Sequence, residues 1–176
     1  MYNRLFAAVL WTGLLHSPAL AGEVPVPTFV DGRWQGGVKG GSNSSDYVEC
    51  WASTEFGDGT VFTLAKRKDG IWNLQLFNPS WRLPQSHRYA MVALVDFYPK
   101  LRIAAEARTP MLLEIADIDQ ISLLGLIENG HTIDLASEGF NEKYELEGSA
   151  KIIGRIRSCF DQLLAGFPAA ENGAAN

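Results

Sequence analysis

The chain is organised around residues 146–160, LEGSAKIIGRIRSCF, where a strand end passes into a helix that carries one of the two cysteines. Ser149 belongs to the residue types that commonly cap helices, so we expect the helix to begin there with Ser149 as its cap. The apolar side chains that follow recur along one face of a helix, which indicates packing against a sheet. They are Ile152, Ile153, Ile156, Phe160, Leu163 and Leu164. Cys159 lies at the edge of this face.

The amino terminus has the pattern of a secretory signal peptide. Arg4 precedes an apolar run over residues 5–15, and the small residues Ala19 and Ala21 follow it. The run is too short to span a bilayer, and small residues three and one positions before the cut suit the signal peptidase. We therefore expect cleavage after Ala21 and a periplasmic or secreted protein without a membrane span.

The other cysteine, Cys50, lies in a segment of strand-like alternation. Two cysteines in an exported chain are expected to pair, because the periplasm and the cell exterior are oxidising. A Cys50–Cys159 bond would close a loop of about 110 residues, which in the chain-entropy model stabilises a protein by about 4–5 kcal/mol. Two separate buried thiols are the alternative.

Between the cysteines the dominant period is two residues, as in half-buried strands. Asp-Gly pairs at 58–59 and 69–70 mark turns, and the second is a hairpin signal. Side chains predicted to share the core are Phe62, Leu64, Trp72, Leu74 and Leu76. Further strands are expected at 89–97, 101–107, 111–115, 132–135 and 143–146. A short helix should begin near Asp117, carry Ile118, Ile121, Leu124 and Ile127 on one side, and end at Asn129-Gly130.

The domain boundaries follow from composition. We expect residues 22–45 to form a flexible arm, since 36–45 is rich in glycine and serine and offers no apolar pattern. Residues 46–166 should be one β-rich domain, and 167–176 a disordered tail. The predicted fold is mainly β with two helices (α+β), an antiparallel β-sandwich or partly open barrel. The C-terminal helix packs on the sheet and is tied to it by the disulfide.

The sequence gives little support for nucleic-acid binding, a metal site or a serine nucleophile. The net charge of −5 disfavours nucleic acid and anionic lipid as general partners. His87 and His131 lack further ligands at metal-binding spacing, so we expect no metal and no cofactor. The sequence has no Gly-x-Ser-x-Gly nucleophile elbow.

The sequence contains enough carboxylates that a hydrolase activity remains an alternative. A glycan hydrolase could use two of them, one with a raised pKa. The candidates are Asp117, Asp119, Glu138, Glu142, Glu145 and Glu147. The aspartates are better explained by a helix start, where negative charge is favourable, and the others by a solvated face. We therefore assign no catalytic residue.

Aromatic residues are the most suggestive group. Trp81 lies in the proline-rich loop 78–84, with Arg82 beside it. An exposed tryptophan next to arginine is typical of a recognition surface, and binding residues concentrate on loops. We assign Trp81 and Arg82 to a candidate binding surface. The alternative is that Trp81 covers one end of a barrel.

One motif resembles a known group of proteins. Tyr-x-Leu-x-Gly-Ser-Ala-x-x-Ile is followed by a cysteine near the end of the chain, and its carriers are Tyr144, Leu146, Gly148, Ser149, Ala150, Ile153 and Cys159. With the signal peptide, the strand cysteine and the Asp-Gly turns, it resembles small exported proteins of alphaproteobacteria, some of them similar to the invasion-associated locus B family. The resemblance covers residues 47–164 and implies no catalytic residues.

These observations favour an exported, non-enzymatic domain that binds another macromolecule, a protein or another component of the cell envelope. Two alternatives remain. The chain could be an inhibitor or immunity-type protein that inserts loop 78–84 into an envelope hydrolase, or it could be a carboxylate-dependent glycan hydrolase.

Overall fold

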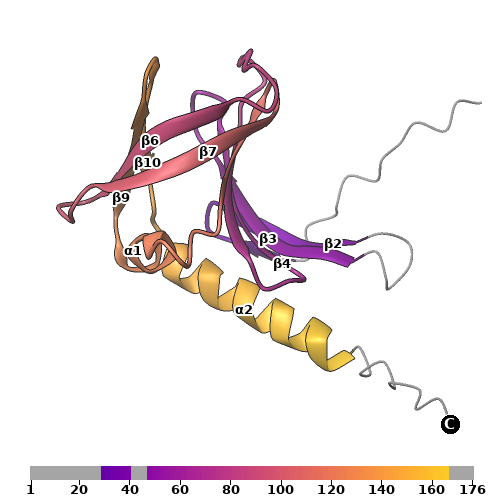
Figure 1. The fold of residues 1–176 in the computed structure, drawn as a ribbon. Coiled ribbons are helices and arrows are strands. Elements are labelled where there is room, and N and C mark those ends of the chain that lie inside the picture. Colours follow the sequence, from indigo (N-terminus) through magenta and orange to yellow (C-terminus); the bar gives the residue numbers. More distant parts are fainter. Residues whose placement is uncertain (1–28, 41–46, 167–176) are drawn as a thin grey trace, which may run out of the picture.

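The computed structural model describes residues 29–40 and 47–166, which form one ten-stranded antiparallel sheet with two helices (Figure 1). The strand order is β1-β2-β3-β4-β5-β8-β7-β6-β9-β10. The strands are β1 (Phe29–Asp31), β2 (Trp34–Gly40), β3 (Tyr47–Glu55), β4 (Val61–Arg67), β5 (Trp72–Phe77), β6 (Arg88–Val95), β7 (Leu101–Thr109), β8 (Leu112–Ala116), β9 (Thr132–Ser137) and β10 (Phe140–Glu145). The helices are α1 (Leu123–Asn129) and α2 (Ser149–Gly166). The expected signal peptide and C-terminal tail lie outside the described residues.

The sheet rolls on itself without closing, which confirms the predicted partly open architecture. Tyr144 on β10 is buried, and its ring centroid lies 4.9 Å from that of Phe56 and 5.6 Å from that of Phe62. The indole nitrogen of Trp34 donates to the carbonyl of Glu147 at 2.8 Å. The two ends of the sheet thus meet through side chains, while β1 and β10 remain at the two ends of the strand order.

The core matches the period-two pattern of the central strands. Phe62, Leu64, Trp72, Leu74 and Leu76 are all buried, as the alternation predicts. The Asp-Gly turns also form, with both glycines at positive φ, where the absence of a Cβ removes the steric penalty. The prediction of a strand meander from residue 47 is therefore confirmed.

Helix α2 lies beneath β2, β3 and β4 (Figure 1) and closes the core, and a disulfide ties it to β3. Ile152, Ile153 and Ile156 on its inner face are buried. Cys159 is bonded to Cys50, with the two Cα atoms 6.1 Å apart, so the predicted disulfide is confirmed. Leu164 is exposed, contrary to the predicted stripe. The buried face of the helix therefore ends before its last turn.

The first helix is shorter than predicted. It begins at Leu123, and residues 117–122 form turns instead. Asp117 and Ser122 have φ values of 60° and 62°, a left-handed conformation that a right-handed helix cannot contain. The apolar periodicity was still informative, because Ile118 is buried although it lies outside the helix.

Ser149 does not act as the predicted helix cap. Its buried hydroxyl donates to the carbonyl of Ile127 at 2.7 Å. That carbonyl lies in the last turn of α1, where backbone oxygens lack partners within the helix. Ser149 therefore joins the two helices, and this role depends on a contact between residues distant in the sequence.

The expectation of a flexible arm over residues 22–45 is wrong for residues 29–40, which form β1 and β2. Trp34 is buried, and a Cβ at Gly36 would collide with the Phe29 ring and the Trp51 carbonyl oxygen. Here glycine permits close packing of strands instead of flexibility. Residues 22–28 and 41–46 lie outside the described part. Within the described part, no helix has the length and apolarity needed to cross a membrane.

Candidate functional site

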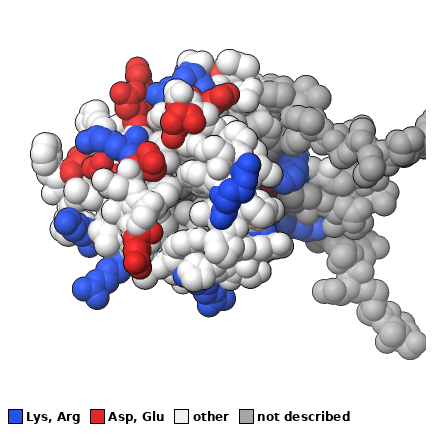
Figure 2. Space-filling model, turned by 90° about the horizontal axis from the view of Figure 1, so that it is seen from above, with Lys and Arg blue, Asp and Glu red and all other residues white. Residues whose placement is uncertain are grey.

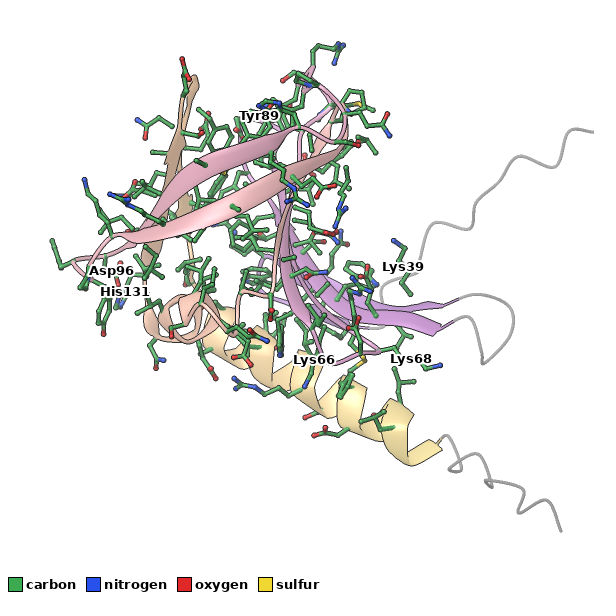
Figure 3. All side chains as sticks on the ribbon, viewed as in Figure 1. Lys39, Lys66, Lys68, Tyr89, Asp96 and His131 are labelled. Atoms are coloured by element: carbon green, nitrogen blue, oxygen red, sulfur yellow. A yellow bond between two sulfur atoms is a disulfide. The ribbon has the colours of Figure 1, made fainter. Side chains whose placement is uncertain are left out.

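The loop between β5 and β6 lies on the side of the molecule away from α2 (Figures 1 and 3). Asn78, at the start of this loop, is buried and braces it. Its Nδ2 donates to Thr60 Oγ1 at 3.0 Å, and its Oδ1 accepts hydrogen bonds from the backbone N and the hydroxyl of Ser80 at 2.9 and 2.6 Å. The backbone N of Leu83 donates to the Pro110 carbonyl at 2.8 Å, which attaches the loop to the β7–β8 turn. The conformation of the loop is therefore fixed from both ends.

The two residues assigned from the sequence lie on this braced loop. Trp81 is half-buried and packs edge-to-face on Phe140 at the start of β10, with ring centroids 5.5 Å apart. Arg82 is exposed, but its Nη1 donates to the carbonyls of Pro79 and Trp81 at 3.0 and 2.6 Å. Trp81 therefore serves the packing of this end in part, while Arg82 lies folded back along its own loop.

Two apolar side chains near the loop are partly exposed. Phe77 and Met111 have exposed fractions of 36% and 37%, and the Met111 carbonyl accepts a hydrogen bond from the Asn78 backbone at 3.0 Å. We call Phe77, Trp81, Arg82 and Met111 the loop-end surface. Seen from above, much of the visible face carries uncharged side chains; acidic side chains gather in its upper and left part, while basic side chains are spread over it (Figure 2).

A second surface, which the sequence did not indicate, lies at the turn between β6 and β7. The Tyr98 backbone N donates to the Val95 carbonyl at 3.0 Å, which closes a β-turn with Asp96 and Phe97 at its centre. The Phe97 side chain is as exposed as in an extended chain, at 103%, and Tyr98 is 48% exposed. We call Phe97 and Tyr98 the aromatic tip.

Asp96 fastens the aromatic tip to the start of β9. Its carboxylate accepts hydrogen bonds from the backbone N atoms of His131 and Thr132 at 2.9 and 2.8 Å, and from the Thr132 hydroxyl at 3.2 Å. The two backbone bonds hold the pKa of Asp96 below its usual range. The side chains of Asp96 and His131 lie side by side at this end (Figure 3). Asp96 also has a left-handed φ of 47°, which aspartate tolerates better than most residues.

A hollow of about 520 Å³ lies beside the aromatic tip. Its lining residues are Asp96, Phe97, Tyr98, Asn129 and His131. The lining thus combines two aromatic residues with three polar ones. The only sequence signal for this site was a pair of aromatic residues in a turn, directly before Pro99.

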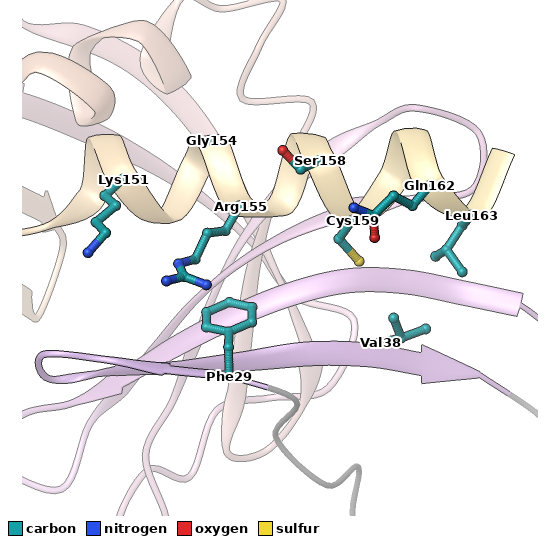
Figure 4. Close-up of a pocket in the computed structure, with 9 residues that line it drawn as sticks. All are labelled: Phe29, Val38, Lys151, Gly154, Arg155, Ser158, Cys159, Gln162 and Leu163. Atoms are coloured by element: carbon teal, nitrogen blue, oxygen red, sulfur yellow. The ribbon is translucent and has the colours of Figure 1, made fainter. Parts of the chain in front are cut away.

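A larger groove of about 750 Å³ separates α2 from β1 and β2 (Figure 4). Its lining includes Phe29 and two cations of α2, Lys151 and Arg155. Both cations bind Asp31, with shortest N–O distances of 2.7 and 3.0 Å, and the hydrogen bond from Lys151 is the main cause of the lowered pKa of Asp31. These charges fasten the helix to β1, which makes the groove a structural contact.

None of the six candidate carboxylates is buried. Glu145 pairs with Arg33 at 3.1 Å, and Glu138 and Glu147 are exposed. Among the described residues, no group of three or more histidine, cysteine, aspartate or glutamate side chains could hold a metal ion. Glu49, which sequence analysis did not single out, is buried, and burial raises its pKa despite Lys39 at 3.6 Å.

Comparison with known proteins adds information on the fold. No protein-family model matches the chain, and no curated protein matches it. A solved structure does, the crystal structure of invasion associated protein B from Bartonella henselae, with a TM-score of 0.55 and 15% sequence identity. The match covers 76% of this chain and 97% of the other. At this identity the likeness shows that the two chains share a fold.

Proposed function

We propose that this chain is an exported, non-enzymatic domain that binds another macromolecule of the cell envelope, a protein or another envelope component. The Cys50–Cys159 disulfide supports export, because such bonds persist in oxidising compartments. The fold is shared with a protein named for an association with invasion, and an exported protein is in keeping with that name.

The loop-end surface is the observation that carries the binding proposal. It combines a half-buried tryptophan, an exposed arginine and two partly exposed apolar side chains on a braced loop. Tryptophan and arginine are enriched among residues that dominate binding energy. A braced loop loses little conformational freedom on binding, so less of the interaction energy is spent on ordering it.

A pull-down from periplasmic extract tests this proposal. The full chain is compared with a double variant, Arg82→Glu with Met111→Ser, which changes two exposed side chains and leaves the Trp81 packing intact. The matched control is Val30→Ser with Arg88→Gln, since both residues are also exposed. We expect the same identified partner with the wild type and the control, and its loss with the double variant. Equal recovery with all three proteins would contradict the proposed surface.

Inhibition of an envelope hydrolase is a second candidate, and the bracing by Asn78 favours it. An inhibitory loop must hold one conformation when it enters an active site, and Asn78 and Leu83 fix loop 78–84 from within and from the β7–β8 turn. If the captured partner is a glycan hydrolase, an equimolar amount of this chain should block its activity, and the Arg82→Glu, Met111→Ser variant should not. Full activity of the hydrolase in the complex would exclude inhibition.

A glycan hydrolase is the third candidate, and Glu49 supplies its one specific observation. A buried carboxylate with a raised pKa suits a general acid, and the Glu114 carboxylate contributes to that rise. Turnover of purified peptidoglycan that disappears in Glu49→Gln would support this candidate. The absence of turnover by the wild type would remove it.

A further inference from the structure

We propose that the aromatic tip is a second docking surface, which inserts Phe97 into an apolar pocket, rimmed by carboxylates, on a folded protein partner. This inference does not depend on the loop-end surface. It rests on three properties of the β6–β7 turn, which are the exposure of its aromatic side chains, its fixed conformation and the sign of its unpaired charges.

The fold makes no use of the Phe97 side chain. Single exposed apolar residues are common on protein surfaces and by themselves carry no meaning. Phe97, however, is fully exposed, is followed by the half-exposed Tyr98, and borders a hollow of about 520 Å³. Two aromatic residues that are consecutive in the chain and line a hollow offer both a projecting side chain and a recess for a side chain of the partner.

The turn is held in place before any partner arrives. Asp96 accepts three hydrogen bonds from His131 and Thr132, and its own backbone N donates to the Thr132 carbonyl at 3.1 Å. These bonds join the end of β6 to the start of β9. A turn whose backbone is already fixed loses less conformational entropy on binding than a mobile one, which favours the residues that it presents as interface anchors.

The charges available around the aromatic tip are positive. Lys100 and Arg102 are exposed, and neither has a hydrogen bond or ion pair within the described part of the chain. The nearest acid, Asp96, already accepts hydrogen bonds from β9. A partner surface that complements this end therefore carries carboxylates around the pocket that receives Phe97.

A lipid surface fits these observations less well than a protein. The chain has a net charge of −5, so an anionic bilayer would repel it at long range. The lining of the hollow also includes Asn129 and His131, whose polar groups suit the hydrogen-bonding side chains of a protein. We therefore commit to a protein partner, and membrane binding is an outcome of the test.

Photocrosslinking followed by titration tests the proposal. The photoreactive residue p-benzoylphenylalanine replaces Phe97 in one variant, Tyr98 in a second and the exposed Val30, on β1, in a control. We expect one and the same envelope protein to be crosslinked from positions 97 and 98 and not from 30. The identified partner is then purified and titrated with the full chain and its variants.

The titration separates the two surfaces of the molecule. Phe97→Ala should weaken binding about thirtyfold, as for a residue that dominates an interface. Lys100→Glu should weaken it about fivefold, with an effect that shrinks at high salt, because it reverses a charge at the rim. Arg88→Glu makes the same charge change at the opposite end of β6, outside both surfaces, and should leave this binding unaltered. Arg82→Glu reports whether the loop-end surface takes part.

Other outcomes would overturn the proposal. They are the absence of a crosslink from position 97 above the control, full affinity in Phe97→Ala, or binding of the full chain to vesicles of phosphatidylglycerol and phosphatidylethanolamine that Phe97→Ala abolishes. The last outcome would replace the protein partner by a membrane. Loss of binding in Arg82→Glu with full binding in Phe97→Ala would remove the aromatic tip and retain the loop-end surface.

Discussion

The loop-end surface and the aromatic tip have similar composition, yet the fold treats them differently. Each has an aromatic residue near a cation and a proline, Trp81 with Arg82 in one and Phe97 with Lys100 in the other. Trp81 packs on Phe140, and Arg82 is bonded to its own loop. Phe97 packs on nothing comparable and is fully exposed. The same residue types can thus serve packing at one place and remain available for binding at another.

Each of the two sites is nevertheless held in place by one polar side chain. Asn78 braces the loop end from a buried position, and Asp96 braces the aromatic tip from a partly exposed one. Because the burial of the two differs, we expect their loss to affect stability to different degrees. The following predictions are arranged from the largest expected effect to the smallest.

Removal of the disulfide tests whether the two surfaces share one scaffold. The double variant Cys50→Ser, Cys159→Ser should lower the free energy of unfolding by about 4 kcal/mol, because the bond closes a long loop in the unfolded chain. Urea denaturation measures the change, with the reduced wild type as control. Since the disulfide lies on α2 and β3, far from both surfaces in the chain, partner binding should persist in protein that remains folded. A loss of binding at only one surface would show that this surface depends on α2.

We expect the loss of the Asn78 side chain to lower the stability of the protein more than the loss of the Asp96 side chain. Asn78→Ala should cost about 2–3 kcal/mol of unfolding free energy, because it removes hydrogen bonds to Thr60 and Ser80 at a buried site. Urea denaturation again provides the measurement, and Ser80→Ala, which removes one exposed partner, serves as the smaller control. A loss below about 0.5 kcal/mol, typical of surface substitutions, would contradict the bracing role.

Truncation of the aromatic residues compares the two surfaces directly. Trp81→Ala should destabilise the protein by about 2 kcal/mol, less than for a fully buried tryptophan, since its ring packs on Phe140 but is only half-buried. Phe97→Ala should change stability by less than about 0.5 kcal/mol. Thermal and urea denaturation of both variants check this difference. An equal loss of unfolding free energy in the two variants would mean that Phe97 contributes to packing.

The aromatic tip should also respond to acid through Asp96. Its pKa is lower in the folded protein than the ordinary 3.8, so the stabilisation it provides is present above that pH and is lost as the pH falls through the folded pKa. Asp96→Asn should remove this acid dependence. Amide hydrogen exchange at His131 and Thr132 gives the local readout, and Asp119→Asn is a control at an exposed aspartate. Unchanged amide exchange rates at His131 and Thr132 in Asp96→Asn would contradict the proposal that this carboxylate holds the turn against β9.

The contrast between the two surfaces explains which parts of the site were accessible to prediction. Trp81 and Arg82 stood out because tryptophan beside arginine in a loop is a compositional signal. Phe97 and Tyr98 were assigned to a strand end and a connection, because a phenylalanine after alternating apolar residues fits a buried strand equally well. Its exposure follows from the turn at Asp96, which depends on hydrogen bonds to β9.

The sequence by itself determined the antiparallel strands, the two Asp-Gly turns, the amphipathic last helix and the pairing of Cys50 with Cys159. These features depend on local periodicity, turn chemistry and the presence of only two cysteines. Tertiary structure alone decided that the glycine-rich 36–40 joins the sheet, that Ser149 links the two helices, and that Phe97 remains exposed. Each of these depends on a segment distant in the sequence, and a local pattern carries no information about which segment will lie against it.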